Sequence, residues 1–362
     1  MNPQVDVLFM TNYCPNYRVE LFNYIASHYR TLFVFQEKRE NPLGSSFNSL
    51  HLRLGLGLVS CVQRSKPIIT ICSFPEHYSP VIALLSKIMH SKLILWSEEW
   101  WMPLTFSRKL LNPAYRWTAK NSILQIVPGS LHEFHMSKFQ NRLDRIHVVP
   151  NAMPTLKGVG DRSIRCDLGL EHDFVILYLG RLVKYKGIEL LLEAYEMAIR
   201  KGSKAKLVVC GEGPIGGDLE EFSIKKRLGV IFTGYVPDER KLDYYQIGDI
   251  LVLPSKIDYQ YSEAWGLVIN EAMMAGLPVI TTNGVGASKD MILPGITGWV
   301  IGEGDRDALC NALLSAEINS GDVAKMGSAA RDFVHSNFSM EQMCKKFCSF
   351  IEDAIQKGIS KP

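Results

Sequence analysis

The sequence contains no long hydrophobic run. No apolar stretch approaches the roughly 18 residues that a helix needs to span a bilayer. The first residues, Met1 to Asp6, also lack the basic start and apolar stretch of a secretory signal peptide. These absences predict a protein without a membrane-spanning helix or a secretory leader, located in the cytoplasm.

Motifs of several common enzyme classes are absent as well. The sequence has no P-loop, no G-x-S-x-G and no H-E-x-x-H, which argues against the commonest NTPases, hydrolases and metalloproteases. Its 8 cysteines form no Cys-x-x-Cys pair, and several lie in apolar runs such as Ile69–Cys72, so we expect buried, reduced thiols. The net charge is only +3, without a clustered basic face, which predicts no nucleic-acid partner.

The chain of 362 residues is long enough for two domains, each with its own core. Short β-branched runs alternate with longer segments of helical period, and the alternation restarts after a polar stretch from Pro154 to Arg165. We therefore predict an α/β fold of two Rossmann-like doubly wound domains, 1–155 and 156–338, facing a central cleft. A C-terminal helix in 339–362 is expected to pack back toward the N-terminal domain. The expected strands are Val5–Met10, Leu32–Phe35, Ile68–Cys72, Leu93–Trp96, Ile123–Val127, Ile146–Val149, Phe174–Leu179, Lys206–Cys210, Val230–Phe232, Ile250–Leu253, Pro278–Thr281 and Gly298–Ile301.

One stretch of the second half combines a glycine at a helix start with two glutamates. A loop ends at Gly266, and a helix is expected from Leu267 onward. Glycine lets a ligand approach the free backbone N–H groups there, and these groups together with the helix dipole suit a phosphate. Glu263 precedes this point and Glu271 lies one turn beyond it, so a sugar, a diphosphate and a ribose could be bound in order. The alternative is that both glutamates are solvated surface charges.

A second element supplies positive charge. The expected strand Phe174–Leu179 leads to Gly180, and Arg181 and Lys186 follow in the loop before the next helix. An arginine fork and a lysine ammonium suit a leaving diphosphate, and the carboxyl end of a parallel strand is where ligands bind. The alternative is two solvated loop cations.

Three weaker motifs point elsewhere. Gly211–Gly216 spells G-x-G-x-x-G, but residues 231–233 hold no acidic residue for a dinucleotide, so a tight turn explains the glycines better. Asp305–Asp307 spells D-x-D just before an expected helix, where we expect a helix cap rather than a metal ligand. His132 and His135 lack a third ligand nearby and are expected to be structural. We therefore predict no metal.

Together these elements resemble the retaining GT-B glycosyltransferases of family 4, also called glycosyltransferase group 1. The resemblance implies transfer of a sugar from a UDP- or GDP-sugar to a saccharide acceptor, with the anomeric configuration kept and with no metal or other cofactor. It covers most of residues 146–300, and the matching segments stand in the family's order. They are Val148–Asn151, Gly180–Leu182 with Lys186 and Gly187, Gly211–Pro214, Phe232–Val236, Val252–Ser255, and the pair Glu263 and Glu271.

The resemblance also implies roles for single residues. Arg181 and Lys186 would bind the donor diphosphate and neutralise the leaving group in place of a metal. Glu263 would hold the transferred sugar, and Glu271 would hold the ribose. Arg181, Lys186 and Glu263 are also the catalytic candidates of the second half. The donor site implied by the resemblance further includes Gly180, Gly213, Tyr235, Val236, Trp265, Gly266 and Leu267, the last two through their backbone amides.

The first half departs from the family pattern. Instead of a glycine-rich turn, the first expected strand is followed by Thr11–Phe22, a form that resembles the subset acting in bacterial surface-polysaccharide assembly. Where many members place a histidine, this chain has Ser97–Trp101, which contains two adjacent glutamates. Which of them contacts the acceptor hydroxyl stays open. The acceptor candidates are Arg18, His77, Glu98 and Glu99, and the two glutamates are also catalytic candidates.

Residues 100–120 mix tryptophan, phenylalanine and tyrosine with lysine and arginine and contain no acidic residue. Such a composition suits an anionic membrane surface, with Arg108, Lys109 and Arg116 as the expected lipid-binding cations. The protein would dock there peripherally at the cytoplasmic face and reach a lipid-linked acceptor. The alternative is that the aromatic residues pack in the core while the cations are solvated.

Two other functions remain open on this architecture. A nucleotide-sugar epimerase would need acid and base carboxylates near the sugar, which Glu98 and Glu99 could supply. An inactive partner subunit is disfavoured because Arg181, Lys186 and the glutamate pair are all present.

Overall fold

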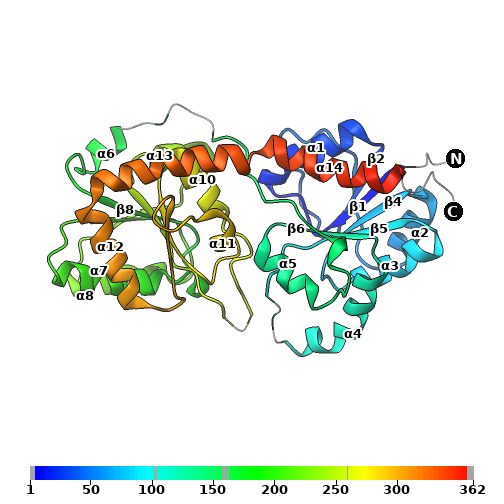
Figure 1. Cartoon of the computed structure of the whole chain (residues 1–362), viewed down its shortest axis with the longest axis horizontal. Coiled ribbons are helices and arrows are strands. Elements are labelled where there is room, and N and C mark those ends of the chain that lie inside the picture. Colours follow the sequence, from blue (N-terminus) through cyan, green and yellow to red (C-terminus); the bar gives the residue numbers. More distant parts are fainter. Residues whose placement is uncertain are drawn as a thin grey trace. The chain divides into compact units, whose positions relative to one another are not determined.

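The structure of the chain is a computed structural model that describes residues 5–101, 103, 105–156, 160, 163–258 and 260–356. It separates into two compact units (Figure 1). Unit 1 comprises Met1–Pro154 and Met340–Pro362, and unit 2 comprises Thr155–Ser339. Residues 157–159, 161, 162 and 357–362, within the expected linker and the expected C-terminal helix, lie outside the described residues.

Unit 1 is built on a parallel sheet of seven strands in the order β3-β2-β1-β4-β5-β6-β7. The chain begins near the middle, moves to one edge and then crosses over to the other, which is the winding expected of a doubly wound sheet. The strands are β1 (Val7–Thr11), β2 (Thr31–Phe35), β3 (Ser49–His51), β4 (Ile69–Ser73), β5 (Lys92–Trp96), β6 (Leu124–Val127) and β7 (Ile146–Val148).

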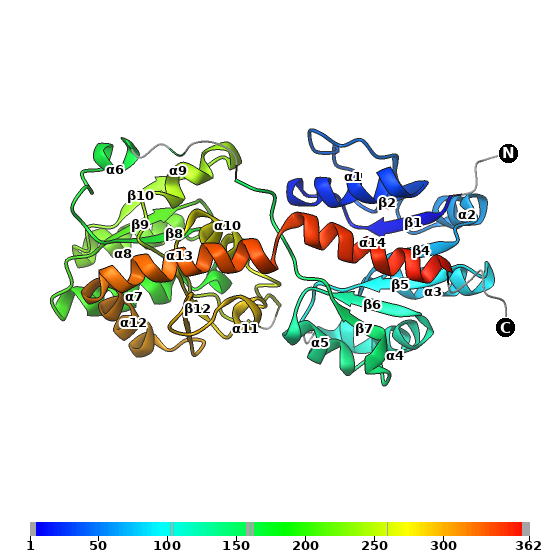
Figure 2. The same cartoon turned by 45° about the horizontal axis from the view of Figure 1, so that its top comes forward.

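Side chains that alternate along these strands form two separate cores in unit 1. Phe9 and Ile71 face one layer of helices, α1 and α14, whereas Leu8 and Met10 face the layer of α2 to α5. Figure 2 shows α14 lying beside α1, although some 300 residues separate them. The helices are α1 (Val19–His28), α2 (Leu56–Ser65), α3 (Ser79–Ile88), α4 (Phe106–Asn121), α5 (Ser130–Ser137) and α14 (Met340–Gln356), with short 3-10 turns η1 (Asn16–Arg18) and η2 (Leu143–Arg145).

Unit 2 repeats this plan with six parallel strands in the order β10-β9-β8-β11-β12-β13. Leu177 and Leu251 face a core with α9, α10, α11 and α13, and Tyr178 and Val252 face a core with α7, α8 and α12. The strands are β8 (Val175–Leu179), β9 (Lys206–Cys210), β10 (Ile231–Gly234), β11 (Ile250–Leu253), β12 (Val279–Thr282) and β13 (Gly298–Ile301). The helices are α6 (Ser163–Asp167), α7 (Ile188–Arg200), α8 (Gly216–Lys226), α9 (Lys241–Tyr245), α10 (Leu267–Ala275), α11 (Ser288–Met291), α12 (Arg306–Ile318) and α13 (Ser320–Asn337), with η3 (Lys184–Lys186) and η4 (Asp238–Arg240).

The predicted fold class, with its two doubly wound sheets and its C-terminal helix, is confirmed. Each of the twelve expected strands forms, and the sequence missed β3, a short edge strand with half-exposed and exposed side chains. The cysteines are all free, and six of the eight are buried, as expected. None of the described helices is both long and apolar enough to cross a membrane.

Candidate functional site

The helix start expected to bind phosphate lies in unit 2 at the carboxyl end of β11. Gly266 precedes α10 with φ 93° and ψ 58°, the left-handed region that favours glycine. A Cβ atom at this position would come within 2.8 Å of Val285 and 3.1 Å of Leu253. The glycine therefore lets the loop turn tightly, and no side chain caps the start of α10. Among its first N–H groups, that of Ile269 donates to the Gly266 carbonyl at 2.8 Å, and the earlier ones, as in any α-helix, have no acceptor within the helix.

Two backbone hydrogen bonds from residues 286 and 287 hold the loop that carries Glu263. The Glu263 carbonyl oxygen accepts from Gly286 N–H at 3.0 Å, and the Trp265 carbonyl oxygen accepts from Ala287 N–H at the same distance. Trp265 itself is buried, and its indole Nε1 donates to Asn270 at 2.9 Å. The Trp265 side chain, predicted to line the donor site, therefore supports the loop from inside.

Glu263 and Lys186 form an ion pair in unit 2, and both side chains are largely buried. Ser255, which follows β11, also donates to Glu263 at 3.4 Å. The pairing brings together two residues that lie 77 positions apart in the sequence. It unites the two elements, one acidic and one basic, that the sequence analysis had selected separately.

Glycines hold the loop of Lys186 against its neighbours. A Cβ atom on Gly187 would overlap the Pro254 carbonyl at 1.9 Å, and Tyr185 accepts a backbone hydrogen bond from Lys256 at 2.8 Å. A Cβ atom on Gly211 would meet the Gly180 carbonyl at 1.9 Å. The G-x-G-x-x-G motif thus serves close packing of two strand-to-helix loops, as the sequence analysis preferred.

Gly213 also serves close packing, because a Cβ atom there would lie 2.2 Å from the Leu182 carbonyl. Arg181 is exposed, and no ion pair to it is found among the described residues. Tyr235 is exposed too, whereas Val236 is buried in the core of unit 2. Of these predicted donor-site residues, Arg181 and Tyr235 offer side chains to solvent, and Val236 contributes to packing.

Glu271 is almost fully buried, with 2% of its surface exposed. One carboxylate oxygen accepts from Lys241 Nζ at 2.9 Å and the other from Tyr245 Oη at 2.6 Å. Burial alone would lower the pKa of Lys241, but Glu271 and Asp238 raise it above its usual value. Burial and Glu271 also raise the pKa of Tyr245. Glu271 therefore stabilises the fold through these contacts and is also a candidate for binding the ligand.

In unit 1, Arg18 is buried, with 1% of its surface exposed. It pairs with Glu98 and donates to Asn151 at 2.8 Å, and Asn151 donates to Glu98 at 3.0 Å. Its guanidinium also lies 4.5 Å from the ring centroid of Trp96. The sequence had named Arg18 and Glu98 independently, and the structure brings them into direct contact.

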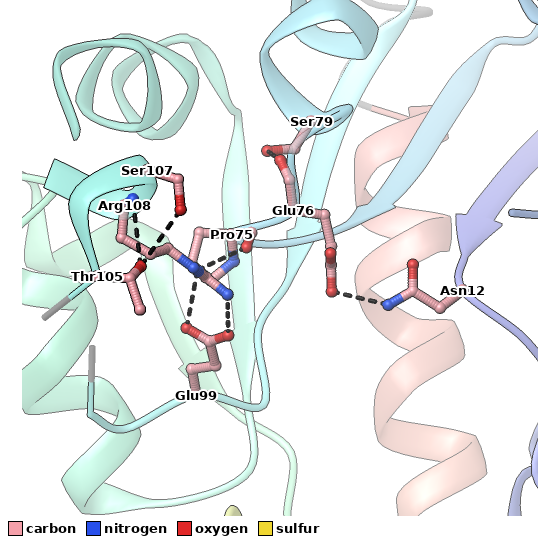
Figure 3. A network of polar contacts seen from close by, with 8 residues as sticks. All are labelled: Asn12, Pro75, Glu76, Ser79, Glu99, Thr105, Ser107 and Arg108. Carbon is pink, nitrogen blue, oxygen red and sulfur yellow. Dashed lines mark hydrogen bonds and ion pairs between the residues drawn. The ribbon is translucent and has the colours of Figure 1, made fainter. Parts of the chain in front are cut away.

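Glu99 has a different partner, Arg108 on α4 (Figure 3). Arg108 holds both carboxylate oxygens, at 2.7 and 3.1 Å, and also donates to the Pro75 carbonyl at 2.8 Å. Burial raises the pKa of Glu99 to about 7, although Arg108 opposes the shift. Next to Pro75, Glu76 accepts from Asn12 at 2.9 Å. The sequence alone gives no signal for Glu76, Asn12 or this role of Arg108.

These groups surround a cavity of about 160 Å³ at the carboxyl ends of β1, β4 and β5. Arg18, Glu98 and Glu99 line it, but His77 is exposed outside it, so the structure gives no support to His77 as an acceptor contact. The remaining lining residues are Thr11, Asn12, Tyr13, Pro15, Tyr17, Phe22, Ser73, Phe74, Glu76 and Trp96.

Within residues 100–120, the segment from Phe106 onward belongs to α4, and several apolar side chains of this helix are exposed. Phe106 and Leu110 are 82% and 70% exposed, and Trp117 is also exposed. Tyr115, in contrast, is buried, so the aromatic residues of this segment are divided between core and surface, and docking on a membrane stays a prediction. Arg108 was expected among the docking cations, but it is bound to Glu99 on the inner side; Met102 and Leu104 lie outside the described residues.

The weaker motifs behave as structural features. Asp305 caps α12 by accepting from Ala308 N–H at 2.8 Å, as expected for this D-x-D. His132 and His135 are buried on α5. Among the described residues, no group of three or more histidine, cysteine, aspartate or glutamate side chains is placed to hold a metal ion.

Comparison with known proteins shows which family part of the chain resembles. Residues 162–333 match the family described as glycosyl transferases group 1. The chain is 30% identical over 238 residues to a lipopolysaccharide 1,2-N-acetylglucosaminetransferase of Salmonella typhimurium, covering 61% of this chain and 60% of that protein. It is 29% identical over 195 residues to the capsular polysaccharide biosynthesis glycosyltransferase CapM of Staphylococcus aureus, covering 53% of this chain and 49% of that one. The matches thus span about half to three fifths of these relatives.

Solved structures extend the similarity to both units. The Anabaena protein HepE, in complex with UDP, superposes with a TM-score of 0.80 at 19% identity, covering 96% of this chain and 100% of that one. At this identity the likeness concerns the fold. Residues 162–333 of this chain therefore match the group 1 glycosyl transferases, and the chain as a whole has the GT-B fold.

Proposed function

We propose that this protein is a retaining, metal-independent glycosyltransferase that moves a sugar from a UDP- or GDP-sugar to a saccharide acceptor in surface-polysaccharide or glycolipid synthesis. The observation that carries the proposal is the Lys186–Glu263 pair beside the open start of α10. A basic group, a carboxylate and free backbone amides meet there, which suits a sugar diphosphate.

Each part of the donor has a candidate partner in unit 2. The diphosphate would meet the amides of Gly266 and Leu267, with Arg181 and Lys186 as counter-charges. A lysine ammonium has three donors, so Lys186 can hold Glu263 and a phosphate oxygen together. Glu263 would hold the sugar hydroxyls and Glu271 the ribose.

During transfer the bond between the anomeric carbon and the phosphate oxygen breaks, the acceptor hydroxyl oxygen bonds to the same face of that carbon, and its proton passes to the leaving diphosphate. Negative charge develops on the leaving diphosphate. Arg181 and Lys186 would stabilise that charge, which is the part a metal ion plays in other transferases. Glu98 and Glu99 in the unit 1 cavity, with Arg18, would contact or orient the acceptor.

The choice of donor and acceptor draws on the relatives. HepE was solved with UDP, which favours a UDP-sugar, and the Salmonella and Staphylococcus relatives are named for lipopolysaccharide and capsular polysaccharide. A thermal-shift panel of UDP, GDP, ADP and their sugars tests the proposal. A ligand at 100 times its Kd stabilises by about 2.7 kcal/mol, so UDP or GDP should raise the Tm clearly. No shift with any nucleotide would contradict a donor site.

We further propose that α4 docks on anionic lipid at the cytoplasmic face, where a lipid-linked acceptor would be reached. Phe106, Leu110 and Trp117 recur at helical spacing, and the exposed cations Lys109 and Lys120 lie on the same helix. Aromatic and aliphatic side chains flanked by cations suit a lipid interface, at about 1 kcal/mol per cation near an anionic surface.

Vesicle sedimentation tests the docking. Binding should need anionic lipid, weaken at high salt and fall when Lys109 and Lys120 are both changed to Glu. Lys225→Glu, an exposed cation of α8 in unit 2, is the matched control and should have little effect. A protein that stays in the supernatant with anionic vesicles at low salt would instead favour a soluble acceptor.

A further inference from the structure

The unit 1 cavity contains a carboxylate that no cation neutralises by direct contact. Glu98 is paired with Arg18, and Glu99 is paired with Arg108. Glu76 also lines the cavity, yet no ion pair to it is found among the described residues. Glu76 therefore gives the lining of this cavity a negative charge that no ion pair balances.

Glu76 is held in place with part of its bonding capacity unused. Asn12 donates to one carboxylate oxygen at 2.9 Å, as Figure 3 shows, and within the described part of the chain no hydrogen bond to the other oxygen is found. The backbone there is fixed as well, because Ser79 Oγ donates to the Glu76 carbonyl at 2.7 Å. A fixed acceptor with a free oxygen at a cavity wall is suited to a ligand hydroxyl.

Arg18 lines the same cavity, is almost fully buried and is paired with Glu98. Its charge is therefore already balanced by a carboxylate. Aromatic side chains, among them Tyr13 and Trp96, complete the lining. Aromatic faces and a few fixed polar groups are the usual composition of a small-molecule site.

We propose that this cavity is an acceptor subsite for the uncharged hydroxyl groups of a sugar, and that Glu76 excludes acidic sugars from it. The proposal rests on the glycosyltransferase function proposed above and adds the class of acceptor. Glu76 becomes the residue that determines specificity, through attraction of hydroxyls and repulsion of carboxylates and phosphates.

The proposed selectivity follows from the negative charge of the partly buried Glu76 carboxylate. A hydroxyl can donate to the free oxygen of ionised Glu76, and this charge-assisted bond is stronger than a neutral one. An anionic group would face repulsion at short range, or would require Glu76 to take up a proton. Burial raises the pKa of Glu76, while the hydrogen bond from Asn12 and the nearby charge of Arg108 lower it, and the discrimination applies while Glu76 is ionised.

Two probes that differ in one charged group test the proposal: methyl α-glucoside and methyl α-glucuronide. Their binding to the full chain in the presence of UDP is measured by saturation-transfer NMR. The variants are Glu76→Gln, which keeps the shape and removes the charge, and Glu133→Gln, an exposed glutamate of α5, as the matched control. Tm and UDP affinity are measured for every variant to establish folding and an intact unit 2.

We expect wild type and Glu133→Gln to bind the glucoside and to discriminate against the glucuronide. Glu76→Gln should reduce this discrimination by roughly tenfold or more, as removal of one charge close to another in a partly buried site would. Equal or tighter binding of the glucuronide to wild type would overturn the proposal, as would no binding of the glucoside, or unchanged discrimination in Glu76→Gln. In each of these cases normal UDP binding would leave the donor site standing, whereas loss of UDP binding in wild type would contradict the proposed function itself.

Discussion

Glu271 allows a sharp test because it has both a structural and a proposed ligand-binding role. The change Glu271→Gln preserves volume, and its amide oxygen can still accept from Tyr245. Its amide nitrogen would then face Lys241 Nζ, donor against donor. Lys241 keeps Asp238 at 2.9 Å and is partly exposed, so it is not left as an unpaired buried cation.

The two roles predict two separate losses. The free energy of unfolding should fall by about 1.5–3 kcal/mol, the worth of a hydrogen bond to a charged group, and not by the roughly 3–5 kcal/mol of a broken buried pair. If Glu271 also binds the ribose, the Kd for UDP should rise by about 10- to 150-fold, since each 1.4 kcal/mol is tenfold. Urea unfolding and calorimetric titration with UDP measure the two quantities.

The matched control is Tyr245→Phe, which removes a donor to Glu271 and leaves the carboxylate charge in place. Tyr245 is fully buried, and no part of the donor is assigned to it. We expect this variant to lose stability, by about 1–3 kcal/mol for an unsatisfied buried partner, while UDP affinity changes little. If Glu271→Gln instead loses stability but binds UDP as wild type does, its role is structural and the ribose assignment is wrong.

Three further predictions concern chemistry and stability. Glu263→Gln should lower turnover more than UDP affinity, because Glu263 addresses the sugar; an equal loss of both in kinetic and calorimetric assays would contradict this. Product NMR should show a retained anomeric configuration, with activity surviving EDTA; inversion, or activity restored only by a divalent ion, would refute the proposed mechanism. Burial lowers the pKa of His135 from 6.5 to about 4, so the unfolded chain binds the proton first, and acidification from pH 6.5 toward 4 should destabilise the fold by up to about 1.4 kcal/mol per pH unit. His135→Gln should show a weaker acid dependence in urea unfolding, and an identical one would refute this attribution.

The sheets could be predicted from the sequence because their strands are buried on both faces. Val175–Leu179 and Ile250–Leu253 are continuous apolar runs, and each carries side chains into two cores. The strand Ser49–His51 could not be recognised, because an edge strand with exposed side chains has no such pattern. Its pairing with β2 is set by tertiary contacts.

The donor site was partly readable because its residues stand at loop and helix boundaries, where Gly266 and Glu263 are conspicuous. The partners of Glu271 were not, because Lys241 and Tyr245 lie 30 and 26 positions upstream on a separate helix. Composition alone also misassigned Arg108: it grouped the residue with the surface cations of α4, although helix geometry turns it inward onto Glu99. Contacts between distant segments are what one sequence alone does not supply.

The central claim is that unit 2 binds the nucleoside diphosphate of a sugar donor around the start of α10. A crystal structure of the protein with UDP tests it most directly. We expect the diphosphate at the amides of Gly266 and Leu267, within reach of Arg181 and Lys186, and the ribose hydroxyls at Glu271. A nucleotide bound in the unit 1 cavity, or in unit 2 without contact to the start of α10, would contradict this assignment.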